Sequence, residues 1–456
     1  MKKCKVVYLL LIAGTLLAQT WQTGPNSTFA FTRFDGEYFP GTGKVYFLGG
    51  RLGTTGTPTD GTIWSFDPVA RTYATVGQAM PVPVSNYEIC LLEDDYNLPD
   101  GDTYGLYIVG GRDNNGNFKR NVQVYYPVSN TAWDITSDPY PAVMTDTVPI
   151  PACGQVVDNK MYVIGGFQNA RAPYVTNQTW VYDPLAPAGS RWTQLANLNV
   201  GRGYINAAVI DSFIYACGGD TFDGTSLIAR TWCERFNAHN PGAGWTRIRD
   251  LPRNNGEARA FGFGAESPYG FANRIIVAGR GTWSSESAHC YIYNALTDSW
   301  ATFPSLNQRR RDHAGAFIPG NQNNNGIPGI WVWGGRQDSD NNVLIITEFY
   351  QFTLTGIAEP AVGKPSELAL SAEPNPFRRA TAFRFNLAQS GRASIRVYAA
   401  NGELVWTSPK QEYSPGSHVT LWNGTTNTGH VSGRGIYFCR LDAENCGAGL
   451  KLTKLD

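Results

Sequence analysis

A short apolar run that ends in two glycines recurs along most of this chain, and this repeat constrains the fold more than any other feature. Five copies are plain: Val45–Gly50, Leu106–Gly111, Met161–Gly166, Ile214–Gly219 and Ile330–Gly335. Their first glycines stand at 49, 110, 165, 218 and 334, so the steps are 61, 55, 53 and 116 residues. The last step is twice 58, and Ile275–Arg280 fills the gap with Ala278 in place of the first glycine. Six copies of one unit predict a repeat architecture.

Each unit has the pattern of four short strands. After the glycines comes a polar loop, then an aromatic strand that ends in a turn such as Asp67-Pro68, then a further aromatic residue and another strand. The further aromatic residues are Tyr73, Trp133, Trp192, Trp245 and Trp300. Aromatic residues make up 13% of the chain, charged residues 16%, and 50 residues are glycine, which suits short strands joined by tight turns. Four antiparallel strands are the size of one propeller blade.

These residues resemble the kelch repeat, and the resemblance covers roughly residues 20 to 355. It implies an all-β fold in which residues 19–355 form a six-bladed kelch β-propeller. The sixth unit lacks a strand after Phe349–Leu354, whereas Trp21 begins a strand that belongs to no unit of its own. We therefore expect the segment around Trp21 to complete blade six, which closes the ring and protects an edge that would otherwise be open.

The first residues have the features of an export signal. Three lysines precede the apolar run Val6–Leu17, and Ala18 is a small residue suited to cleavage. We expect residues 1–18 to be removed as a signal peptide, no transmembrane segment to remain, and the protein to be secreted or held at the cell surface. A membrane-anchored N-terminus is the alternative. The formal net charge of zero does not support nucleic-acid binding, which needs an excess of basic residues.

The composition changes after Leu354. Residues 356–367 contain proline and glycine and are expected to be a linker, whereas residues 368–456 alternate apolar and polar side chains, which predicts a small Ig-like β-sandwich. Asn375-Pro376-Phe377, Leu421–Gly424 and the closing Lys451–Leu455 resemble the C-terminal sorting domain of type IX secretion cargo, and equally the Ig-like domain of the flagellar hook-capping protein. The resemblance implies that this tail engages the secretion machinery or attaches the protein to a surface. A spacer without a sorting role is the alternative.

The alternating strand direction of an antiparallel sheet divides the loops of each blade between two faces. We name the strands a to d from the axis outward, so that the b–c and d–a loops share one face and the a–b and c–d loops share the other. The b–c loops are the longer ones, for example Arg51–Gly61 and Asp220–Ile228, whereas the a–b and c–d connections are mostly short. Long loops on a rigid scaffold usually carry function. We therefore expect a glycan or protein ligand on the b–c/d–a face.

Arginines stand near this face in most units. Those expected around a central funnel are Arg51, Arg112, Arg202, Arg259, Arg280, Arg310 and Arg336. Guanidinium groups arranged in this way suit a carboxylate or another anion. The alternative is that each arginine pairs with a local carboxylate, such as Glu257 or Asp312, or is solvated. His313 follows Arg310 with the Arg-x-x-His spacing of kelch repeats and is expected to be structural.

The motifs predict no metal, cofactor or catalytic site. No CxxC pair is present, and the five histidines are widely scattered. We find neither paired carboxylates at a credible site nor a nucleophile motif. Seven cysteines follow the expected signal peptide. Among them Cys217 and Cys233 lie on neighbouring strands, and Cys439 and Cys446 flank a hairpin, so both pairs are possible disulfides.

Binding is the function that these features favour: an exported propeller that holds a glycan, a peptide or a surface protein. An enzyme is the first alternative, because six-bladed kelch proteins include sialic-acid mutarotases, and arginines around the funnel suit an anionic sugar. A purely structural surface protein is the second alternative. The fold by itself does not decide among the three.

Overall fold

The computed structural model describes residues 19–53, 59–94, 104–141, 153–167, 174–265, 267, 269–282, 285–319, 328–338, 342–352, 370–387, 390–399, 402–443 and 446–455. The expected signal peptide and linker, 1–18 and 356–367, lie outside these ranges. Within them the chain is all-β, with one 3-10 turn, η1 (Pro241–Ala243). Six antiparallel sheets and two further sheets account for most of the strands.

The first three sheets, which we call blades one to three, follow one another along the chain. Blade one has β2 (Phe31–Thr32) and β3 (Glu37–Phe39) side by side on β4 (Lys44–Leu52), then β5 (Thr59–Asp67) and β6 (Thr72–Ala79). Blade two has β7 (Cys90–Glu93), β8 (Tyr104–Val109), β9 (Val122–Tyr126) and β10 (Thr131–Asp134). Blade three has β11 (Cys153–Val157), β12 (Lys160–Phe167), β13 (Val175–Tyr182) and β14 (Trp192–Gln194).

Blades four to six repeat the pattern, and in blades four and five the b–c loop carries a small hairpin of its own. Blade four has β15 (Asn206–Ile210), β16 (Phe213–Cys217), β19 (Cys233–Asn237) and β20 (Trp245–Ile248), with the hairpin β17 (Asp220–Phe222) and β18 (Leu227–Ala229). Blade five has β21 (Arg259–Phe263), β22 (Arg274–Ala278), β25 (Cys290–Asn294) and β26 (Ser299–Phe303), with the hairpin β23 (Arg280–Thr282) and β24 (Ser285–Ser287). Blade six has β27 (Ala314–Ile318), β28 (Gly329–Trp333), β29 (Thr347–Gln351) and β1 (Gln22–Thr23).

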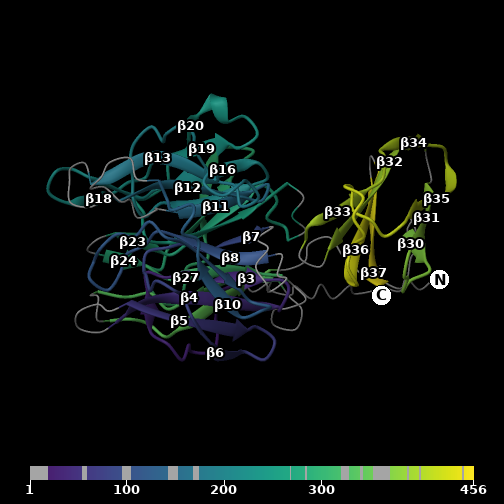
Figure 1. Ribbon diagram of the computed structural model, residues 1–456. Helices are drawn as coiled ribbons and strands as arrows, with labels where there is room; N and C mark the ends of the chain where they lie inside the picture. The colour runs from purple at the N-terminus through teal and green to yellow at the C-terminus, as the bar shows by residue number, and fades with distance from the viewer. Residues whose placement is uncertain are drawn as a thin grey trace, which may run out of the picture.

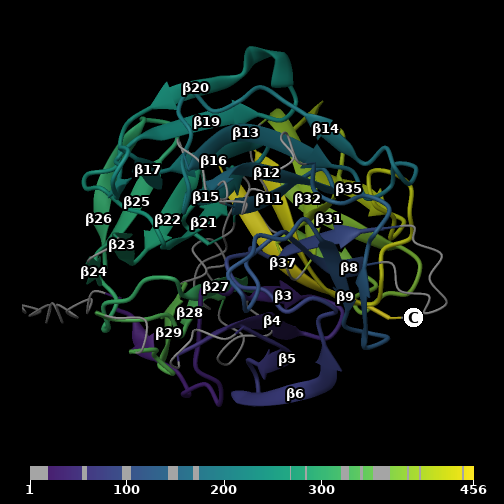
Figure 2. The ribbon, with the colours of Figure 1, turned by 60° about the vertical axis from the view of Figure 1, so that its left-hand side comes forward.

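The six blades form a closed ring around a central axis (Figure 2). The inner strands touch one another in cyclic order: β3 contacts β7 and β27, β11 contacts β7 and β15, and β21 contacts β15 and β27. The buried residues of the described chain form six hydrophobic core clusters. Five of these clusters belong to the ring and lie within and between its blades. The architecture is that of a β-propeller, in which each blade buries its faces against its two neighbours.

The chain closes the ring with its own N-terminal segment. β1 is antiparallel to β29 and is the outermost strand of blade six, with Gln22 opposite Phe349, as the sequence analysis expected. Trp21 is 3% exposed, donates its indole N–H to the carbonyl of Pro304 at 2.8 Å, and meets the ring of Tyr350 edge-on at 5.7 Å. The closure therefore depends on a buried anchor as well as on backbone pairing.

The glycine pairs have the physical role that the repeat suggested. Gly218, the first glycine of blade four, has a φ of +67°, and a Cβ there would lie 2.0 Å from the carbonyl oxygen of Asn255. A side chain is excluded both by the backbone conformation and by the neighbouring chain, which enters the next inner strand at this point. Glycine is therefore required at this position of the repeat, where two adjacent blades lie close together.

The C-terminal residues form a separate unit of two antiparallel sheets beside the propeller (Figure 1). One sheet has the order β30 (Leu370–Glu373), β31 (Thr381–Leu387) and β35 (Gly416–Trp422). The other has the order β33 (Leu404–Thr407), β32 (Gly391–Ala399), β36 (Gly435–Ala443) and β37 (Cys446–Lys454), with β34 (Gln411–Tyr413) also on β32. Both sheets contribute to one core, which includes Phe383, Ile395 and Trp422 and contains no propeller residue.

No helix that could span a membrane is found in the described part of the chain.

Candidate functional site

A cavity of about 770 Å³ lies along the propeller axis. Its walls are the inner strands of the blades, and its mouth is formed by the a–b connections of blades four, five and six, where Asp211, Tyr269 and Pro319 line it. Gly402, Glu403 and Leu404 of the C-terminal unit also line it, so this unit stands at the mouth. We call this cavity the central channel. It opens on the a–b/c–d face, which is opposite to the face that the sequence analysis favoured.

The expectation of mostly short a–b connections holds for some blades only. Blade three turns at Asp158 and Asn159, but β21 ends at Phe263 and β22 begins only at Arg274. Connecting segments of similar length join β7 to β8 and β27 to β28. Three blades therefore have long a–b connections, of which the structure describes only parts.

Three carboxyl groups converge on the inner part of the channel. Asp35 and Glu37 stand two residues apart at the inner edge of blade one, and Glu88 stands just before β7 of blade two. Asp35 and Glu37 both line the channel. Asp35 is buried, whereas Glu37 and Glu88 are half-buried. No motif in the sequence predicted any of the three.

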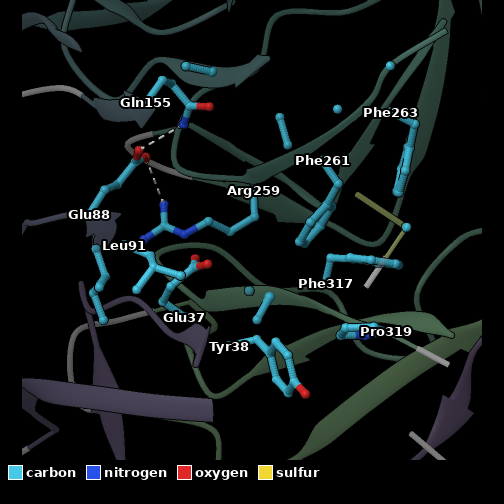
Figure 3. A pocket seen from close by; sticks show the side chains of 18 of the residues that line it. Glu37, Tyr38, Glu88, Leu91, Gln155, Arg259, Phe261, Phe263, Phe317 and Pro319 are labelled. Carbon is cyan, nitrogen blue, oxygen red and sulfur yellow. Dashed lines mark hydrogen bonds and ion pairs between the residues drawn. The ribbon is translucent and has the colours of Figure 1, made fainter. Parts of the chain in front are cut away.

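Arg259, on the inner strand of blade five, holds two of these carboxyls. Its Nε donates to Asp35 at 3.0 Å, and a terminal guanidinium nitrogen lies 3.7 Å from Glu88. The other terminal nitrogen donates to the carbonyl of Phe34 at 2.7 Å. Glu88 also accepts the backbone N–H of Gly154 at 2.9 Å. Figure 3 shows the contacts of Glu88 with Arg259 and with the side chain of Gln155. Arg259 thus ties blade five to blades one and two across the channel.

The environment of the channel raises the pKa of two of its carboxyls. Burial, together with the neighbouring charge of Asp35, raises the pKa of Glu37 to about 8. Burial also raises the pKa of Glu88 to about 8, although Arg259 opposes the increase while Asp35 adds to it. Near neutral pH both groups hold a proton and can donate as well as accept a hydrogen bond. Shifted carboxyls inside a cavity are typical of a functional site.

One side of the channel is aromatic. Phe261 and Phe263 follow Arg259 at every second position of β21, and Phe317 comes from β27 of blade six. Figure 3 shows these rings on one side and Glu37, Glu88 and Arg259 on the other. The channel therefore offers a polar group and an apolar surface to the same ligand, which is the usual composition of a small-molecule site.

At the other end of the channel, residues from five blades form a circuit of hydrogen bonds, and the segment that precedes β11 of blade three lies outside the described residues. The backbone N–H of Arg33 donates to Asp312, that of Asp312 to Glu257, both at 2.8 Å, and that of Glu257 to Tyr204 at 3.4 Å. The N–H of Asn86 donates to Arg33 at 2.7 Å, and its side-chain amide donates to the Tyr204 hydroxyl at 3.4 Å. All five residues have a positive φ, between 48° and 62°. Only a cavity of about 40 Å³ lies among them.

These five positions are equivalent in their blades. In four of the five cases the residue two positions later lines the channel: Asp35 after Arg33, Glu88 after Asn86, Asn206 after Tyr204, and Arg259 after Glu257. A backbone held in the left-handed region is strained for residues other than glycine, and such strain persists only where the surroundings fix it. The circuit therefore sets the register with which each inner strand enters the channel.

Two of the expected funnel arginines have a structural role instead. Arg202 and Arg310 are fully buried and form ion pairs with Glu234 at 2.8 Å and with Glu348 at 2.7 Å. Each also donates to two backbone carbonyls: those of Gly218 and Trp232 for Arg202, and those of Gly334 and Ile346 for Arg310. The alternative of local pairing therefore holds for both of these arginines.

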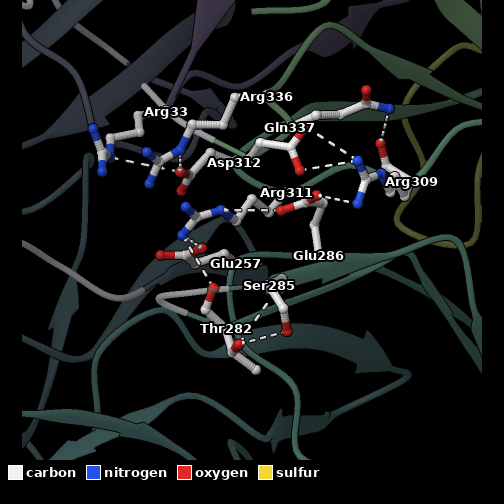
Figure 4. A network of polar contacts seen from close by, with 12 residues as sticks. Arg33, Glu257, Thr282, Ser285, Glu286, Arg309, Arg311, Asp312, Arg336 and Gln337 are labelled. Carbon is white, nitrogen blue, oxygen red and sulfur yellow. Dashed lines mark hydrogen bonds and ion pairs between the residues drawn. The ribbon is translucent and has the colours of Figure 1, made fainter. Parts of the chain in front are cut away.

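The remaining funnel arginines are only partly brought together. Arg336 is buried against Asp312 at 2.6 Å, in a network that also contains Arg33 and Arg311 (Figure 4). Arg51 is buried, and its pKa is lowered to about 10 by burial and by the nearby charges of Arg33 and Arg112. Arg280 donates to the carbonyl and side chain of Asn254, both at 2.6 Å. Of the seven predicted arginines, Arg259 is the one that lines the central channel.

The histidine and cysteine expectations can be placed as well. His313 is fully buried, and burial together with the charge of Arg310 lowers its pKa well below the usual value, which agrees with a structural role.

Cys217 and Cys233 stand directly opposite each other on β16 and β19, but both are free thiols. Cys439 is also free, and it stands opposite Leu450 rather than Cys446, so the expected bridge in this hairpin is not formed. In the described part of the chain no group of three or more metal-binding side chains is found.

Comparisons with known proteins agree with this geometry. The family model described as "Kelch motif" matches residues 151–199. Kelch-like protein terF of Aspergillus terreus is 34% identical over 118 residues, which are 24% of this chain and 25% of that protein. Kelch-like protein 26 of Danio rerio is 26% identical over 206 residues, which are 44% of this chain and 30% of that protein. The chain thus spans less than a third of the length of either relative.

A solved structure gives the same result for the fold. The structure titled "Structure of YjhT" superposes with a TM-score of 0.52 at 14% sequence identity, and the match covers 73% of this chain and 98% of that one. At such low identity the likeness concerns the fold alone.

Proposed function

Since this chain is a kelch-repeat propeller protein with a polar cavity on its axis, we propose that it is a binding protein that takes a small organic ligand into the central channel. The observation that carries this proposal is the convergence of Asp35, Glu37, Glu88 and Arg259, from three blades, on one cavity of about 770 Å³. Titratable groups with shifted pKa values that converge on one cavity favour a ligand site. The proposal replaces the b–c/d–a face with the channel mouth on the a–b/c–d face.

A ligand panel tests this proposal. We would record thermal shifts with neutral sugars, sugar acids, amino acids and amines, and then measure affinities by calorimetry for any compound that stabilises the protein. Arg259→Gln should weaken binding at least about tenfold, because Asp35 and Glu88 lose the group that holds them. Arg280→Gln is the matched control, since Arg280 lies outside the cavity lining and should leave affinity unchanged. If no compound class binds, the proposal fails.

A second candidate is catalysis of proton transfer, and one observation favours it. Glu37 and Glu88 both have a pKa of about 8, so each can lose or take up a proton near neutral pH. Sugar mutarotation, which the kelch resemblance raised, needs an acid and a base of this kind. Exchange spectroscopy of sugar anomers tests it: a rate increase that is lost in Glu37→Gln and in Glu88→Gln supports catalysis, and an unchanged rate leaves binding alone.

For the C-terminal unit we propose a role in secretion or surface attachment, which would place the protein outside the cell. The motifs that suggested this role lie together. The backbone of Phe377 pairs with that of Thr453 and Leu455, at 2.9 and 2.7 Å, and the Asn375 side chain donates to Lys451 at 2.8 Å. The first and last parts of the unit thus form one structure for a partner to recognise.

Truncation tests this role. A chain that lacks residues 368–456 should accumulate inside the cell envelope while the full chain is exported. Thermal unfolding of the purified truncated chain checks that the propeller remains folded, since its cores contain no residue of this unit. Unchanged export of the truncated chain would show that the unit has no sorting role.

A further inference from the structure

A deeper property of the central channel, which rests on the proposed function, concerns the charge of its ligand. Among the described residues that line the cavity, five carry carboxyl groups and one is arginine: Asp35, Glu37, Glu88, Asp211 and Glu403 against Arg259. The chain as a whole has a formal net charge of zero, so acid is concentrated at this place. A cleft lined by one sign of charge attracts ligands of the opposite sign.

The single arginine is already occupied. Arg259 is paired with Asp35 at 3.0 Å, lies 3.7 Å from Glu88, and donates to a backbone carbonyl at 2.7 Å. An anionic ligand would have to break these contacts, and it would enter next to the remaining carboxyls. Breaking one partner of a buried ion pair is costly, so Arg259 is unsuited to receive an anion.

Glu37 is the acidic group that lacks such compensation. Its carboxyl points into the cavity (Figure 3) and has no hydrogen-bond or ion-pair partner among the residues that the structure describes. Burial and the charge of Asp35 raise its pKa to about 8, so without a cation nearby it holds a proton. A half-buried carboxyl of this kind gains most from a positive charge placed next to it.

The aromatic side of the channel adds a second requirement. Phe261, Phe263 and Phe317 line the cavity beside the acidic groups, and Phe261 and Phe263 are themselves largely buried. Aromatic rings stabilise the apolar part of a ligand by burying it against their surface, and the faces of the rings also attract cations. The site therefore suits a molecule with both a positive group and an apolar body.

We propose that the central channel binds an organic cation, with its ammonium or guanidinium group on Glu37 and its apolar body against Phe261, Phe263 and Phe317. Binding drives the proton off Glu37 and leaves an ion pair in its place. The titratable and charged groups that face Glu37 or share its cavity, from all elements around it, are Asp35, Tyr38, Glu88, Cys90, Asp211, Arg259, Tyr269 and Glu403.

A matched set of probes tests the inference: phenethylamine, phenethyl alcohol and phenylacetate share one aromatic body and differ in charge. Calorimetry at about pH 7 should show phenethylamine binding at least about tenfold tighter than the alcohol, with phenylacetate weakest. Titrations in two buffers of different ionisation enthalpy should show release of close to one proton per amine. At that pH a carboxyl with a pKa of about 8 is about nine-tenths protonated.

Two variants make the outcome specific. Glu37→Gln keeps the shape of the side chain but cannot ionise, so it should lose both the preference for the amine and the proton release. Glu412→Gln, at an exposed position of β34, should change neither. Thermal unfolding checks that both variants are folded.

The results separate this inference from the proposed function. If phenethylamine does not bind, or binds no better than the alcohol or phenylacetate, or releases no proton, the inference is overturned. The binding function itself fails only if the whole ligand panel fails, or if bound ligands are insensitive to Arg259→Gln.

Discussion

The guanidinium of Arg202 lies 2.8 Å from the carboxylate of Glu234, and neither side chain is exposed to solvent. The pair joins the d–a connection of blade four to its third strand, and Arg310 and Glu348 repeat it in blade six. Removing the arginine leaves a buried carboxylate without its cation. We expect Arg202→Ala to lower the free energy of unfolding by about 3 to 5 kcal/mol. Urea unfolding measures this effect.

A double-mutant cycle serves as the control for that experiment. Replacing both Arg202 and Glu234 by apolar residues of similar size should cost much less than removing either one, because no uncompensated charge remains. If Arg202→Ala instead leaves stability unchanged and weakens ligand binding, the arginine belongs to a site after all.

The N-terminal closure of the ring gives a second prediction. Trp21 is buried at the seam of blade six, so Trp21→Ala should lower the free energy of unfolding by about 3 to 5 kcal/mol. Trp133, which is 41% exposed on blade two, is the matched control, and its replacement by alanine should cost about 0.5 kcal/mol. Equal effects of the two substitutions would mean that the seam is not a stabilising contact.

The raised pKa of Glu37 predicts how stability depends on pH. The folded-state pKa of about 8 lies above the ordinary value of 4.5, so the folded protein binds one more proton than the unfolded chain between these values. The free energy of unfolding should therefore fall as the pH rises from about 5 to about 8. Each such carboxyl contributes a slope of about 1.4 kcal/mol per pH unit.

Glu37→Gln removes one titrating group and should therefore reduce the size of this slope by about 1.4 kcal/mol per pH unit, while Glu88 keeps its own contribution. Denaturant titrations at several pH values measure both slopes. A variant with the slope of the unchanged protein would show that Glu37 ionises normally in the channel.

The thiols of Cys217 and Cys233 predict an effect of oxidation. They face each other on adjacent strands of blade four, where opposed Cα atoms lie within the range of a disulfide. Protein recovered from an oxidising compartment should carry this cross-link, seen by peptide mapping without reduction. It should raise the free energy of unfolding by about 3 kcal/mol relative to reduced protein. Cys217→Ser should make stability independent of the redox state.

Much of the ring follows from sequence because its signals are local. A Cβ at Gly165, Gly218 or Gly334 would meet the backbone of the next blade, so the spacing of the Gly-Gly pairs predicts the six repeats before any strand pairing is known. Counting the strands of each unit shows that the sixth lacks a strand after Phe349 and that the strand at Trp21 has no unit of its own. The second strand can therefore be assigned to the vacant place in blade six. Both inferences need only the periodicity of one unit and the cost of an open sheet edge.

The channel was harder to predict because its residues are distant in sequence. Asp35, Glu37 and Glu88 belong to no motif, and they meet Arg259 only when blades one, two and five close on the axis. A weak signal was available in the two acidic residues at the start of an inner strand, Asp35 just before β3 and Glu37 as its first residue. The prediction that Arg202 and Arg310 face a ligand was wrong for another reason. Both arginines stand at the same position of their repeats, but their partners Glu234 and Glu348 are distant in sequence and were not recognised.

The circuit that joins Arg33, Asn86, Tyr204, Glu257 and Asp312 leaves a cavity of about 40 Å³ at the end of the channel opposite its mouth. We therefore expect a long glycan or peptide to insert only a terminus, and every ligand to enter and leave by the mouth. Glu403 of the C-terminal unit lines this mouth. A movement of the C-terminal unit relative to the propeller would therefore change how quickly a ligand binds and leaves, without altering the residues at the inner end of the channel.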